Sequence, residues 1–465
     1  MKNFYIITTL LLSLVSFSQL SNKHWIPPLH SRDDTAIQDH YLYLSTPETT
    51  PFQVTVKTGD GNPIAGSPFT ISRTNPSIIL IGNGQPSSMF LDQTDLNVVV
   101  SDKGLILEST KDFYASFRMR AQNHAETLIS KGKPGIGTSF RLGSTPQGGE
   151  ISIRNFVASV MATQDNTTIT LSDYDTDVQF VTLNGNIGDD SQTFVLNKGQ
   201  SIVFSGYTDV TANWTGFIGA LVVADKPIAV NTGNATGGVT NNGSDITLDQ
   251  IVSASQIGTE YIFIEGNGLP EMERPLIIAN ENNTEIYVNG NTTPIAILNA
   301  GDYTLIPNSY YQGTNNKNIY IRSSKPVFAY QLIGGAASSP TSGLNFIPPL
   351  SCFFQNSVYI PSINSIGNTD YSADLMVLTY GSSTITVNGN PINPATSEAV
   401  LGNTDWVTYR ISGYTGDVNV ISTGPLAVGV FGASGAAGYA GYYSGFGSAP
   451  TDTDVTVCSS ATKDL

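Results

Sequence analysis

The chain has 465 residues, of which 12% are charged, and it contains 45 glycines and 24 prolines. Its apolar residues, 40% of the chain, lie in short runs. This composition favours an all-β protein with many turns over a disordered one. The formal net charge is −16 and the 21 Lys and Arg residues are scattered, which argues against nucleic-acid binding because no basic stripe is present to neutralise phosphates.

Residues 1–18 have the pattern of a secretory signal peptide. Lys2 supplies a positive charge, an apolar run follows, and small residues precede Gln19. Cleavage is expected after Ser18. The alternative, an uncleaved membrane anchor, needs about 20 apolar residues, which neither this stretch nor any later one supplies. We therefore expect a mature chain that is secreted or held at the cell surface and does not span the membrane.

Three of the four histidines lie within the first 40 residues, close to several aspartates. A metal or catalytic cluster is conceivable there, but the spacing matches no metal-binding motif and the segment reads as a loop. The residues concerned are His24, His30, His40, Asp33, Asp34 and Asp39, and the fourth histidine is His124.

Short strand-like phrases recur along the chain in a fixed order. "DKPIAV", "SKPVFAY" and "TGPLAV" place Lys226, Lys325 and Gly424 at intervals of 99 residues (325 − 226 = 99; 424 − 325 = 99), and a worn copy begins at Ser109. Period-two alternation of β-branched and aromatic residues marks these phrases as strands. Two further phrases recur in the same order, one as "NTTITL", "NTEIYV" and "SSTITV" and one as "IGTSFRLG" and "IGTEYIFIEG". The sequence therefore predicts four tandem units.

Tight turns punctuate each unit. Asn-Gly-Asn occurs at 184–186, 289–291 and 388–390, and Asn-Gly supplies the positive φ angles of a hairpin turn. The "SSKP" stretch before "VFAYQL" is predicted to be the turn of another hairpin, with Pro326 at the first position of a core strand.

The fold class predicted from these patterns is all-β, with four tandem β-sandwich-like repeats of about 100–120 residues. About seven short strands per unit suit a sandwich. A β-propeller, the alternative, would use four strands in about 40–50 residues. The expected divisions are a signal peptide at 1–18, repeats at 19–123, 124–243, 244–341 and 342–449, and at 450–465 a linker with the start of a truncated further domain.

An acidic stretch in the second unit is a weak calcium candidate. "DYDTDV" sets Asp173, Asp175 and Asp177 in alternation, and carboxylate oxygens are calcium ligands. The sixth and twelfth positions of a calcium loop are Val178 and Asn184, however, so an acidic strand end facing solvent is the alternative. No other cofactor is expected.

No catalytic residue is predicted. The chain has no Gly-x-Ser-x-Gly elbow and no phosphate-binding loop. Glu271 and Glu273 of "EMER" are the nearest pair of carboxylates for glycoside hydrolysis, which needs a separation of about 5–9 Å in space that sequence spacing does not reveal. They are expected to be solvated in a polar loop.

Loops are expected after each repeated strand, at equivalent places in the four units. Tyrosines among small residues provide adaptable binding area, and the first of these loops is the most basic patch of the chain. The alternative is that the aromatic residues pack against a neighbouring unit. The candidate ligand-binding residues are Arg118, Arg120, His124, Tyr439, Tyr442, Tyr443 and Phe446.

Cys352 and Cys458 are the two cysteines. A secreted chain of this length with two cysteines must rely on hydrophobic cores rather than on a disulfide framework. Whether the two pair is left open.

The phrases "DNTTITL", "LNKGQSIVF" and "FIGALVVADKPIAVNTGN", in this order, resemble the N-terminal domain of the IgG Fc-binding protein family, and the resemblance covers about Trp25 to Phe446. "RMRAQNHAETLISKG" is similar to bacterial members, and the signal followed by an Asn/Thr/Gly-rich chain looks like a secreted protein of a Bacteroidetes-type bacterium. The resemblance implies an extracellular repeat protein, often attached to the surface. In the animal protein it implies binding of antibody Fc in mucus. The resemblance identifies no ligand-binding residues in this chain.

The function expected from the sequence is non-catalytic binding or adhesion outside the cell. The ligand would be a protein or a glycan, held by several loops at once with a gain in avidity. The alternative is a secreted carbohydrate-active enzyme or its accessory module. The oligomeric state, and whether the repeats form a rod or close on one another, stay open.

Overall fold

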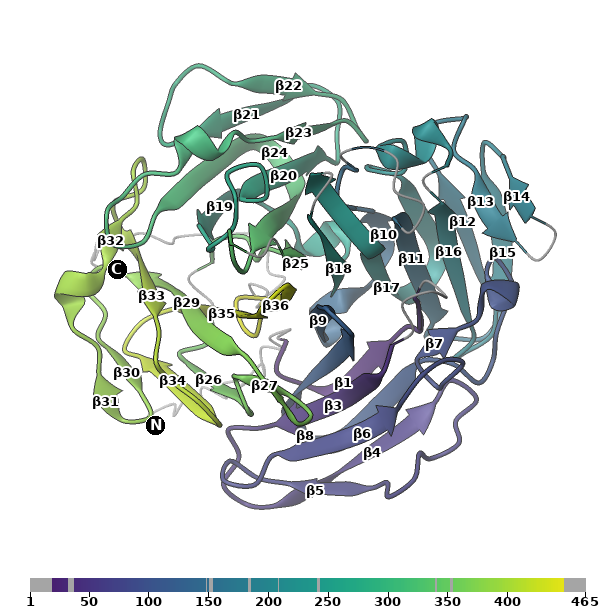
Figure 1. Cartoon of the computed structure of the whole chain (residues 1–465), viewed down its shortest axis with the longest axis horizontal. Coiled ribbons are helices and arrows are strands. Elements are labelled where there is room, and N and C mark those ends of the chain that lie inside the picture. Colours follow the sequence, from purple (N-terminus) through teal and green to yellow (C-terminus); the bar gives the residue numbers. More distant parts are fainter. Residues whose placement is uncertain are drawn as a thin grey trace, which may run out of the picture.

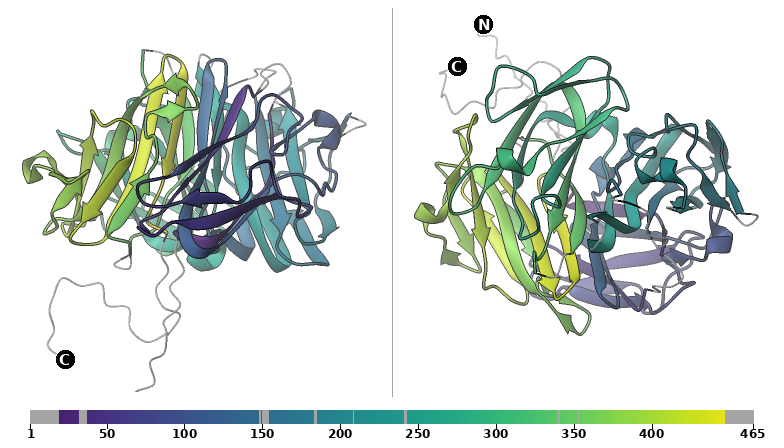
Figure 2. Two further views of the ribbon diagram at one scale, coloured as in Figure 1. Left: turned by 90° about the horizontal axis from the view of Figure 1, so that it is seen from below. Right: turned by 45° about the horizontal axis from the view of Figure 1, so that its top comes forward.

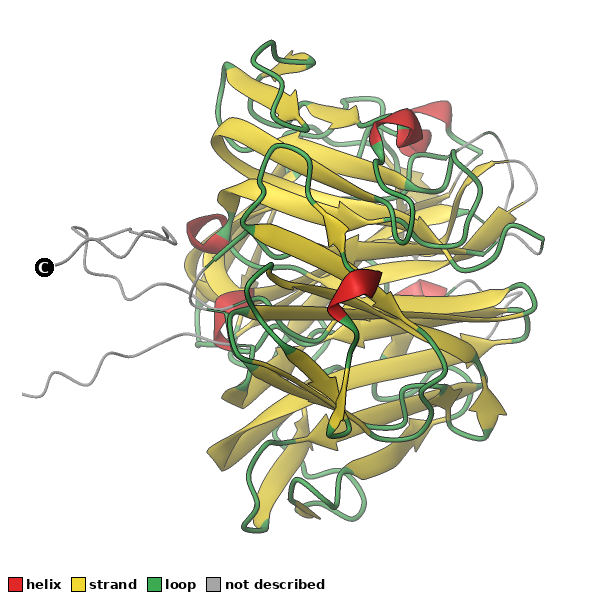
Figure 3. Ribbon diagram, turned by 90° about the vertical axis from the view of Figure 1, so that its left-hand side faces the viewer, coloured by secondary structure: helices red, strands yellow, loops and turns green. Residues whose placement is uncertain are grey.

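The computed structural model describes residues 19–446 apart from 32–36, 148, 150–153, 183–184, 208, 241–242, 339–340 and 352–353. The signal peptide, the expected linker and both cysteines lie outside the described residues. Within them the chain is built of strands and short 3₁₀ turns (Figure 3), which confirms the all-β prediction. The 3₁₀ turns are η1 (Gln93–Asp95), η2 (Lys133–Gly135), η3 (Thr211–Trp214), η4 (Ala254–Gln256), η5 (Asn308–Tyr310) and η6 (Pro394–Thr396).

The first unit is organised around one long strand, β8. The half of β8 that comes first pairs with β1 and β4, and the other half pairs with β3 and β9. The long strand thus passes from one sheet layer into the other, and the inward side chains of both layers form one core. The strands are β1 (Ser21–Ile26), β2 (Leu29–His30), β3 (Asp39–Ser45), β4 (Phe52–Thr58), β5 (Phe69–Ile71), β6 (Ser77–Gly82), β7 (Phe90–Leu91), β8 (Leu105–Ala121) and β9 (His124–Ile129).

The second unit repeats this topology, with the order β15-β12-β17-β11-β16 and with β10 and β18 paired to the long strand β17. Its strands are β10 (Ile136–Arg141), β11 (Asn155–Ala162), β12 (Thr167–Ser172), β13 (Phe180–Thr182), β14 (Gly185–Ile187), β15 (Gln192–Leu196), β16 (Ser201–Tyr207), β17 (Leu221–Thr240) and β18 (Gly243–Gln250).

The third unit has the same order, β22-β21-β24-β20-β23, with β19 and β25 paired to β24. Its strands are β19 (Gly258–Ile264), β20 (Arg274–Ala279), β21 (Thr284–Val288), β22 (Ala296–Leu298), β23 (Tyr303–Leu305), β24 (Asn318–Gly334) and β25 (Ser342–Phe346).

In the fourth unit the long strand is divided into β34 and β35, and the two layers separate into a four-stranded and a five-stranded sheet. This division shows the sandwich-like character of the repeat directly. The strands are β26 (Ser357–Ile360), β27 (Ser365–Ile366), β28 (Thr369–Asp370), β29 (Ser372–Tyr380), β30 (Ile385–Val387), β31 (Asn390–Pro391), β32 (Glu398–Ala399), β33 (Trp406–Ile411), β34 (Val418–Ser422), β35 (Leu426–Ser434) and β36 (Ala437–Tyr442).

The four units close into a ring (Figure 1). Strands β9, β18, β25 and β36 lie at its centre, and each contacts the next in cyclic order, β36 returning to β9. The closure is also made at the chain ends, where the backbone N–H of Gln19 donates to the carbonyl of Phe446 at 3.0 Å. Seen from the edge, the ring is a thick disc (Figure 2).

Two local expectations differ from the structure. The "SSKP" stretch is not a hairpin turn, because β24 runs unbroken through it with only a register shift opposite Gly258 and Glu260. The segments expected as loops after the repeated strands are hairpins whose returning strands β9, β18, β25 and β36 form the centre of the ring. Through this pairing the first three units continue past 123, 243 and 341.

The Asn-Gly turns agree with the sequence prediction. Asn289 and Gly290 have φ angles of 52° and 76°, and Asn388 and Gly389 have 51° and 79°. Positive φ at both central residues is the type I′ geometry that matches the twist of a hairpin.

Candidate functional site

The seam between the fourth and first units closes the ring, and it is fastened by one buried cation. The guanidinium of Arg118, on β8, donates to the carbonyls of Pro361, Ser362 and Ser365 at 2.7, 2.6 and 2.9 Å and to the hydroxyl of Tyr443 at 3.0 Å. The Arg118 side chain is fully buried. Carbonyl dipoles and hydroxyl oxygen therefore replace the hydration of this charge.

Two tyrosines fasten the same segment of the fourth unit. The ring of Tyr43 lies 3.9 Å from the guanidinium carbon of Arg118, a cation–π arrangement, and its hydroxyl donates to Ser365 and accepts from the N–H of Gly367. Tyr439 donates to the carbonyl of Ile363. We call these contacts, made by Arg118, Tyr43 and Tyr439 on residues 361–367, the closing latch.

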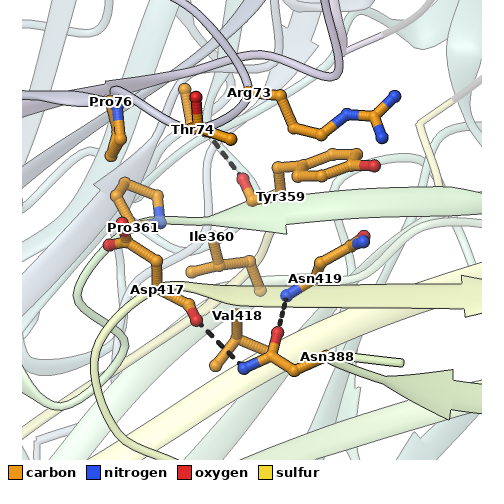
Figure 4. Close-up of a pocket in the computed structure, with 11 residues that line it drawn as sticks. Arg73, Thr74, Pro76, Tyr359, Ile360, Pro361, Asn388, Asp417, Val418 and Asn419 are labelled. Atoms are coloured by element: carbon orange, nitrogen blue, oxygen red, sulfur yellow. Dashed lines mark hydrogen bonds between the residues drawn. The ribbon is translucent and has the colours of Figure 1, made fainter. Parts of the chain in front are cut away.

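A pocket of about 290 Å³ opens on the outside of this seam, directly beyond the latch (Figure 4). Loops and strand ends of the first unit form one side and β26, β34 and the turn after β30 form the other. Its lining residues are Ser45, Arg73, Thr74, Pro76, Tyr359, Ile360, Pro361, Asn388, Asp417, Val418 and Asn419. Because both sides are required, the pocket exists only in the closed ring.

The polar groups of the pocket are held by backbone contacts that leave some of their atoms available. Arg73 is exposed, donates from Nε to Pro47, and lies 5.5 Å from the ring of Tyr359. One oxygen of Asp417 accepts from the N–H of Ser362 at 2.9 Å. Among the described residues, the terminal guanidinium nitrogens of Arg73 and the second carboxylate oxygen of Asp417 have no hydrogen-bond partner.

The amides of the pocket are ordered by the repeated turn. Asn388 accepts from the N–H of Asn419 at 2.7 Å and donates to the carbonyl of Asp417 at 3.2 Å. The side-chain oxygen of Asn419 is covered and has no hydrogen-bond partner among the described residues. Such an unsatisfied group costs about 1–3 kcal/mol and calls for an explanation.

Buried carboxylates connect the central strands to one another. Asp245 accepts from the N–H groups of Ala125 and Gly438 and from the hydroxyl of Thr341. The carboxylate oxygens of Asp245 thus accept hydrogen bonds from residues of all three other units. Burial raises the pKa of Asp245.

Glu126 and Asp249 have the same kind of role. Glu126 accepts from the N–H of Ala440 at 3.1 Å, and Asp249 accepts from the N–H groups of Ile129 and Phe346. Burial raises the pKa of Glu126 well above its ordinary value. It also raises the pKa of Asp249, and the ammonium of Lys131, 2.8 Å away, offsets part of that rise. These perturbed groups have a structural cause, because each satisfies backbone donors where four strands meet.

The aromatic residues proposed as ligand-binding lie in the interior. Tyr439, Tyr442, Tyr443 and Phe446 are at most 4% exposed. Tyr439 belongs to the closing latch, Tyr443 accepts a hydrogen bond from Arg118 of the first unit, and Phe446 stacks on Phe346 of the third unit with 5.8 Å between ring centroids. The structure thus places Tyr443 and Phe446 against neighbouring units, which was the alternative interpretation, and the role of the four aromatic residues toward a ligand stays a prediction.

The basic candidates are separated from one another. Arg118 is in the closing latch, Arg120 forms an ion pair with Asp39 at 2.5 Å, and His124 lies 3.5 Å from the carboxylate of Asp245. The structure does not gather the three into one exposed basic patch.

The histidines of the first unit are core residues. His24 is bonded to Ser130 and to the carbonyl of Phe113, and His40 packs between Phe90 and Phe117. Burial lowers the pKa of His24 and of His40 to about 4 in each case. His24 and His40 therefore have packing and hydrogen-bonding roles in the core rather than those of metal ligands. Asp33 and Asp34 lie outside the described residues.

The acidic stretch of the second unit is occupied by local contacts. Asp173 forms an ion pair with Arg141 at 2.8 Å, and Asp175 accepts from the N–H of Asp177. In the ranges that the structure describes, no three His, Cys, Asp or Glu side chains group as metal ligands. Calcium binding there stays a prediction.

Glu273 differs from the solvated residue that was expected. It is buried and accepts from the N–H groups of Gly266, Gly268 and Gly334 at 2.7–2.9 Å. Burial raises its pKa to about 7. Glu271 is exposed, so the two carboxylates of "EMER" have different environments.

Sequence reasoning missed the pocket residues Arg73, Tyr359, Asp417 and Asn419. The repeat offered one signal, because the turn at Asn388 was recognised and Asn419 lies 99 residues after Tyr320 (419 − 320 = 99). Nothing in a single sequence indicates, however, that the first and fourth units meet there.

The chain matches a known family over most of its length. A family model described as "IgGFc binding protein" matches residues 125–432, about two thirds of the chain. No curated protein matches it.

Three solved structures show a distant likeness to the chain. The native α2-macroglobulin of Escherichia coli has a TM-score of 0.17 at 11% identity, with 88% of this chain and 31% of that chain covered. The trypsin-activated form of that protein has a TM-score of 0.12 at 7% sequence identity, with 93% of this chain and 42% of that chain covered. A mutant of the Salmonella protein has a TM-score of 0.10 at 8% sequence identity, with 95% of this chain and 40% of that chain covered. The chain spans less than half the length of each, and scores this low carry no argument.

Proposed function

Because the chain belongs to the IgGFc binding protein family, we propose that it is an extracellular, non-catalytic binding protein whose ligand is an extracellular protein. The family match at residues 125–432 is the observation that carries this proposal. It extends from the first central strand, β9, into β35, and so includes three of the four strands that meet at the centre of the ring.

The packing of the ring determines which surfaces are available to a ligand. The four central strands are almost entirely buried, so a ligand meets the outer turns and the seams between units. Of these, the seam of the fourth and first units has a pocket with apolar, aromatic and hydrogen-bonding groups together. Concave sites of this composition are the usual places for ligands.

Secretion is part of the proposal. The signal-peptide pattern at 1–18 supports export, with cleavage after Ser18. Across the ranges that the structure describes, no helix has the length and apolar character needed to cross a membrane. A bacterial source and attachment to the cell surface are supported by the sequence resemblance alone.

Binding to antibody Fc is the direct test. The purified, signal-cleaved chain is passed over immobilised IgG Fc, with the Fab fragment of the same antibody as the matched surface. Saturable binding to Fc and none to Fab is the expected result. Equal responses on both surfaces, or none on either, would overturn Fc as the ligand.

A further inference from the structure

We propose that the pocket at the closing seam binds one neutral pyranose ring of a glycan. This inference rests on the proposed binding function, because it names the chemical class of a ligand for the pocket of that same protein. Three observations carry it: the size of the pocket, its chemistry, and the buried aromatic side chain at the equivalent place in the third unit.

The size of the pocket suits a single ring. Its volume of about 290 Å³ lies at the lower end of the range of roughly 300–1,000 Å³ found for pockets that hold drug-sized molecules. A length of peptide or a second sugar ring would therefore extend out of it. A terminal sugar fits within it.

The chemistry of the walls matches the two kinds of surface on a sugar. Pyranose rings have C–H faces and a rim of hydroxyls. The rings of Tyr359 and Pro76 supply apolar surface, while Arg73 and Asp417 supply forked donors and acceptors for neighbouring hydroxyls. Figure 4 shows Tyr359, Pro76, Arg73 and Asp417 among the residues around the pocket.

The charges of the pocket favour a neutral ligand. Arg73 is its one cation and Asp417 its one carboxylate, and the chain as a whole carries −16. An anionic sugar would be attracted to Arg73 but repelled by Asp417 and by the overall field. A single carboxylate also lacks the partner that glycoside hydrolysis requires, so the site is suited to binding rather than cleavage.

In the third unit a buried tyrosine occupies the equivalent place. Tyr320 is the counterpart of Asn419, 99 residues earlier, and Asn289 braces it as Asn388 braces Asn419. Tyr320 is 5% exposed and packs with Trp406 and Phe354 of the fourth unit. At the closing seam Asn419 has this position and lines the pocket, and its cross-strand neighbour is Tyr359 in place of the Ile262 that lies beside Tyr320.

A sugar hydroxyl would supply the hydrogen-bond partner that the side-chain amide of Asn419 lacks. Its side-chain oxygen is covered and unpaired in the described part of the chain, and the side chain extends toward Tyr359 (Figure 4). Rotation of the amide about its last bond would present either its oxygen or its nitrogen to a hydroxyl, since both kinds of atom belong to the same planar group.

The test uses the full secreted chain and defined sugars. Saturation-transfer NMR is recorded with the methyl glycosides of galactose, mannose, fucose and N-acetylglucosamine, and with N-acetylneuraminic acid as the anionic probe. We expect saturable binding of at least one neutral glycoside. Arg73→Ala should weaken it by about tenfold or more, the size of one charge-assisted hydrogen bond.

Two further variants make the assignment specific. Asn419→Tyr fills the pocket with the side chain that the third unit tolerates at its counterpart, and it should abolish sugar binding while leaving the melting temperature near that of the parent. Arg322→Ala is the matched control, because Arg322 also stacks on a tyrosine, Tyr287, at 4.0 Å but lies in the third unit. It should leave sugar binding unchanged.

The outcomes separate this inference from the proposed function. Fc binding without binding of any neutral glycoside overturns the inference alone, as does binding of N-acetylneuraminic acid only. Sugar binding without Fc binding overturns Fc as the ligand and leaves the inference standing. Equal losses in Arg73→Ala and Arg322→Ala would place the sugar elsewhere on the ring and overturn the pocket assignment.

Discussion

Two junctions of the ring, that of the second and third units and that of the fourth and first, are made by hydrogen bonds to equivalent backbone carbonyls. The side chains that donate these hydrogen bonds differ. Tyr330, on β24, donates to the carbonyl of Arg141 at the end of β10. Arg118, on β8, donates to the carbonyl of Pro361 just after β26. In both places the long strand of one unit reaches the end of the first strand of the preceding unit.

The surroundings of the two contacts differ. Tyr330 lies in one apolar cluster that runs without interruption from the second unit through the third. The apolar cluster of the fourth unit includes only Ala125 and Ile129 among the buried residues of the first, and Arg118 makes its contacts through hydrogen bonds. Apolar burial is non-directional, whereas hydrogen bonds fix a register.

This difference follows from chain connectivity. Consecutive units are held close by the chain itself, so apolar burial is enough to join them. The first and fourth units must find each other across the whole sequence, and the latch selects one arrangement among many. It also keeps that interface polar and incompletely filled, which is why a pocket occurs there.

The largest expected effect is at the apolar junction. Tyr330→Ala should lower the free energy of unfolding by about 3–5 kcal/mol, because a fully buried aromatic ring leaves a cavity when truncated. Tyr330→Phe, which removes only the hydroxyl, should cost about 1 kcal/mol. Urea unfolding followed by tryptophan fluorescence measures both. Similar values for the two variants would show that the hydrogen bond, not packing, holds this junction.

At the closing seam, Arg118→Met should cost about 3 kcal/mol. Methionine keeps much of the apolar stem but removes the charged donor from three carbonyls, and that of Pro361 keeps no other donor among the described residues. Hydrogen bonds to charged groups contribute about 1.5–3 kcal/mol each before compensation by the release of a buried charge. The same unfolding measurement applies. Arg322→Met, at a partly exposed stacked arginine, is the control and should change stability by less than about 1 kcal/mol. A negligible cost for Arg118→Met would remove the latch as the basis of closure.

The parts of the fold that depend on local pattern were predictable from the sequence. The strand alternation, the 99-residue period and the turns at Asn289 and Asn388 all concern neighbours in the chain, and the structure agrees with them. The bend at "SSKP" was misjudged because Pro326 suits both the start of a strand and a bulge in the middle of a long one.

The centre of the ring was not predictable for a physical reason. One of its strands, β36, consists of Gly, Ala and Tyr alone, a composition that indicates a loop when it is read by itself. A side chain at Gly438 would meet Thr341 at 2.4 Å, and one at Gly441 would meet Ile129 at 2.6 Å. Small residues are therefore required where four strands converge, and this requirement comes from other units.

The same limit applies to the candidate site. Arg118 stood out as a basic residue in an acidic chain, but its acceptors lie more than 240 positions away. The sequence could identify the residue without identifying its partner. For Arg73 and Asn419, which lie on opposite sides of the pocket, no local pattern was available.

Acid should act on the first unit and so on the closing seam more than on the apolar junction. All four histidines lie within the first 124 residues, and the pKa values of His24 and His40 are lowered to about 4 by burial. A group with a lowered folded-state pKa makes the unfolded state bind more protons. Stability is therefore retained above pH 6.5 and lost as the pH falls toward 4.

A single variant isolates this effect. Neither ring nitrogen of His40 has a hydrogen-bond partner among the described residues, so His40→Leu removes the titrating group without breaking a bond. The loss of stability between pH 7 and pH 4.5 should be smaller than in the parent by about 2 kcal/mol. Buried carboxyls such as Asp245 have raised pKa values and act in the opposite direction, but they are present in both proteins and cancel. Equal losses in the two proteins would exclude His40 as the source.

The smallest expected effect compares one substitution at both places. Tyr43→Phe removes the hydroxyl that bonds Ser365 and Gly367 while leaving the ring against Arg118, and it should cost about 1 kcal/mol, as Tyr330→Phe does. The two variants should differ when each is combined with Arg118→Met. Since Tyr43 and Arg118 share the carbonyl of Ser365, their costs should be non-additive by about 0.5 kcal/mol or more, whereas those of Tyr330 and Arg118 should add. Additive costs for Tyr43 and Arg118, measured by the double-mutant cycle, would mean that the latch is a set of independent contacts rather than one unit.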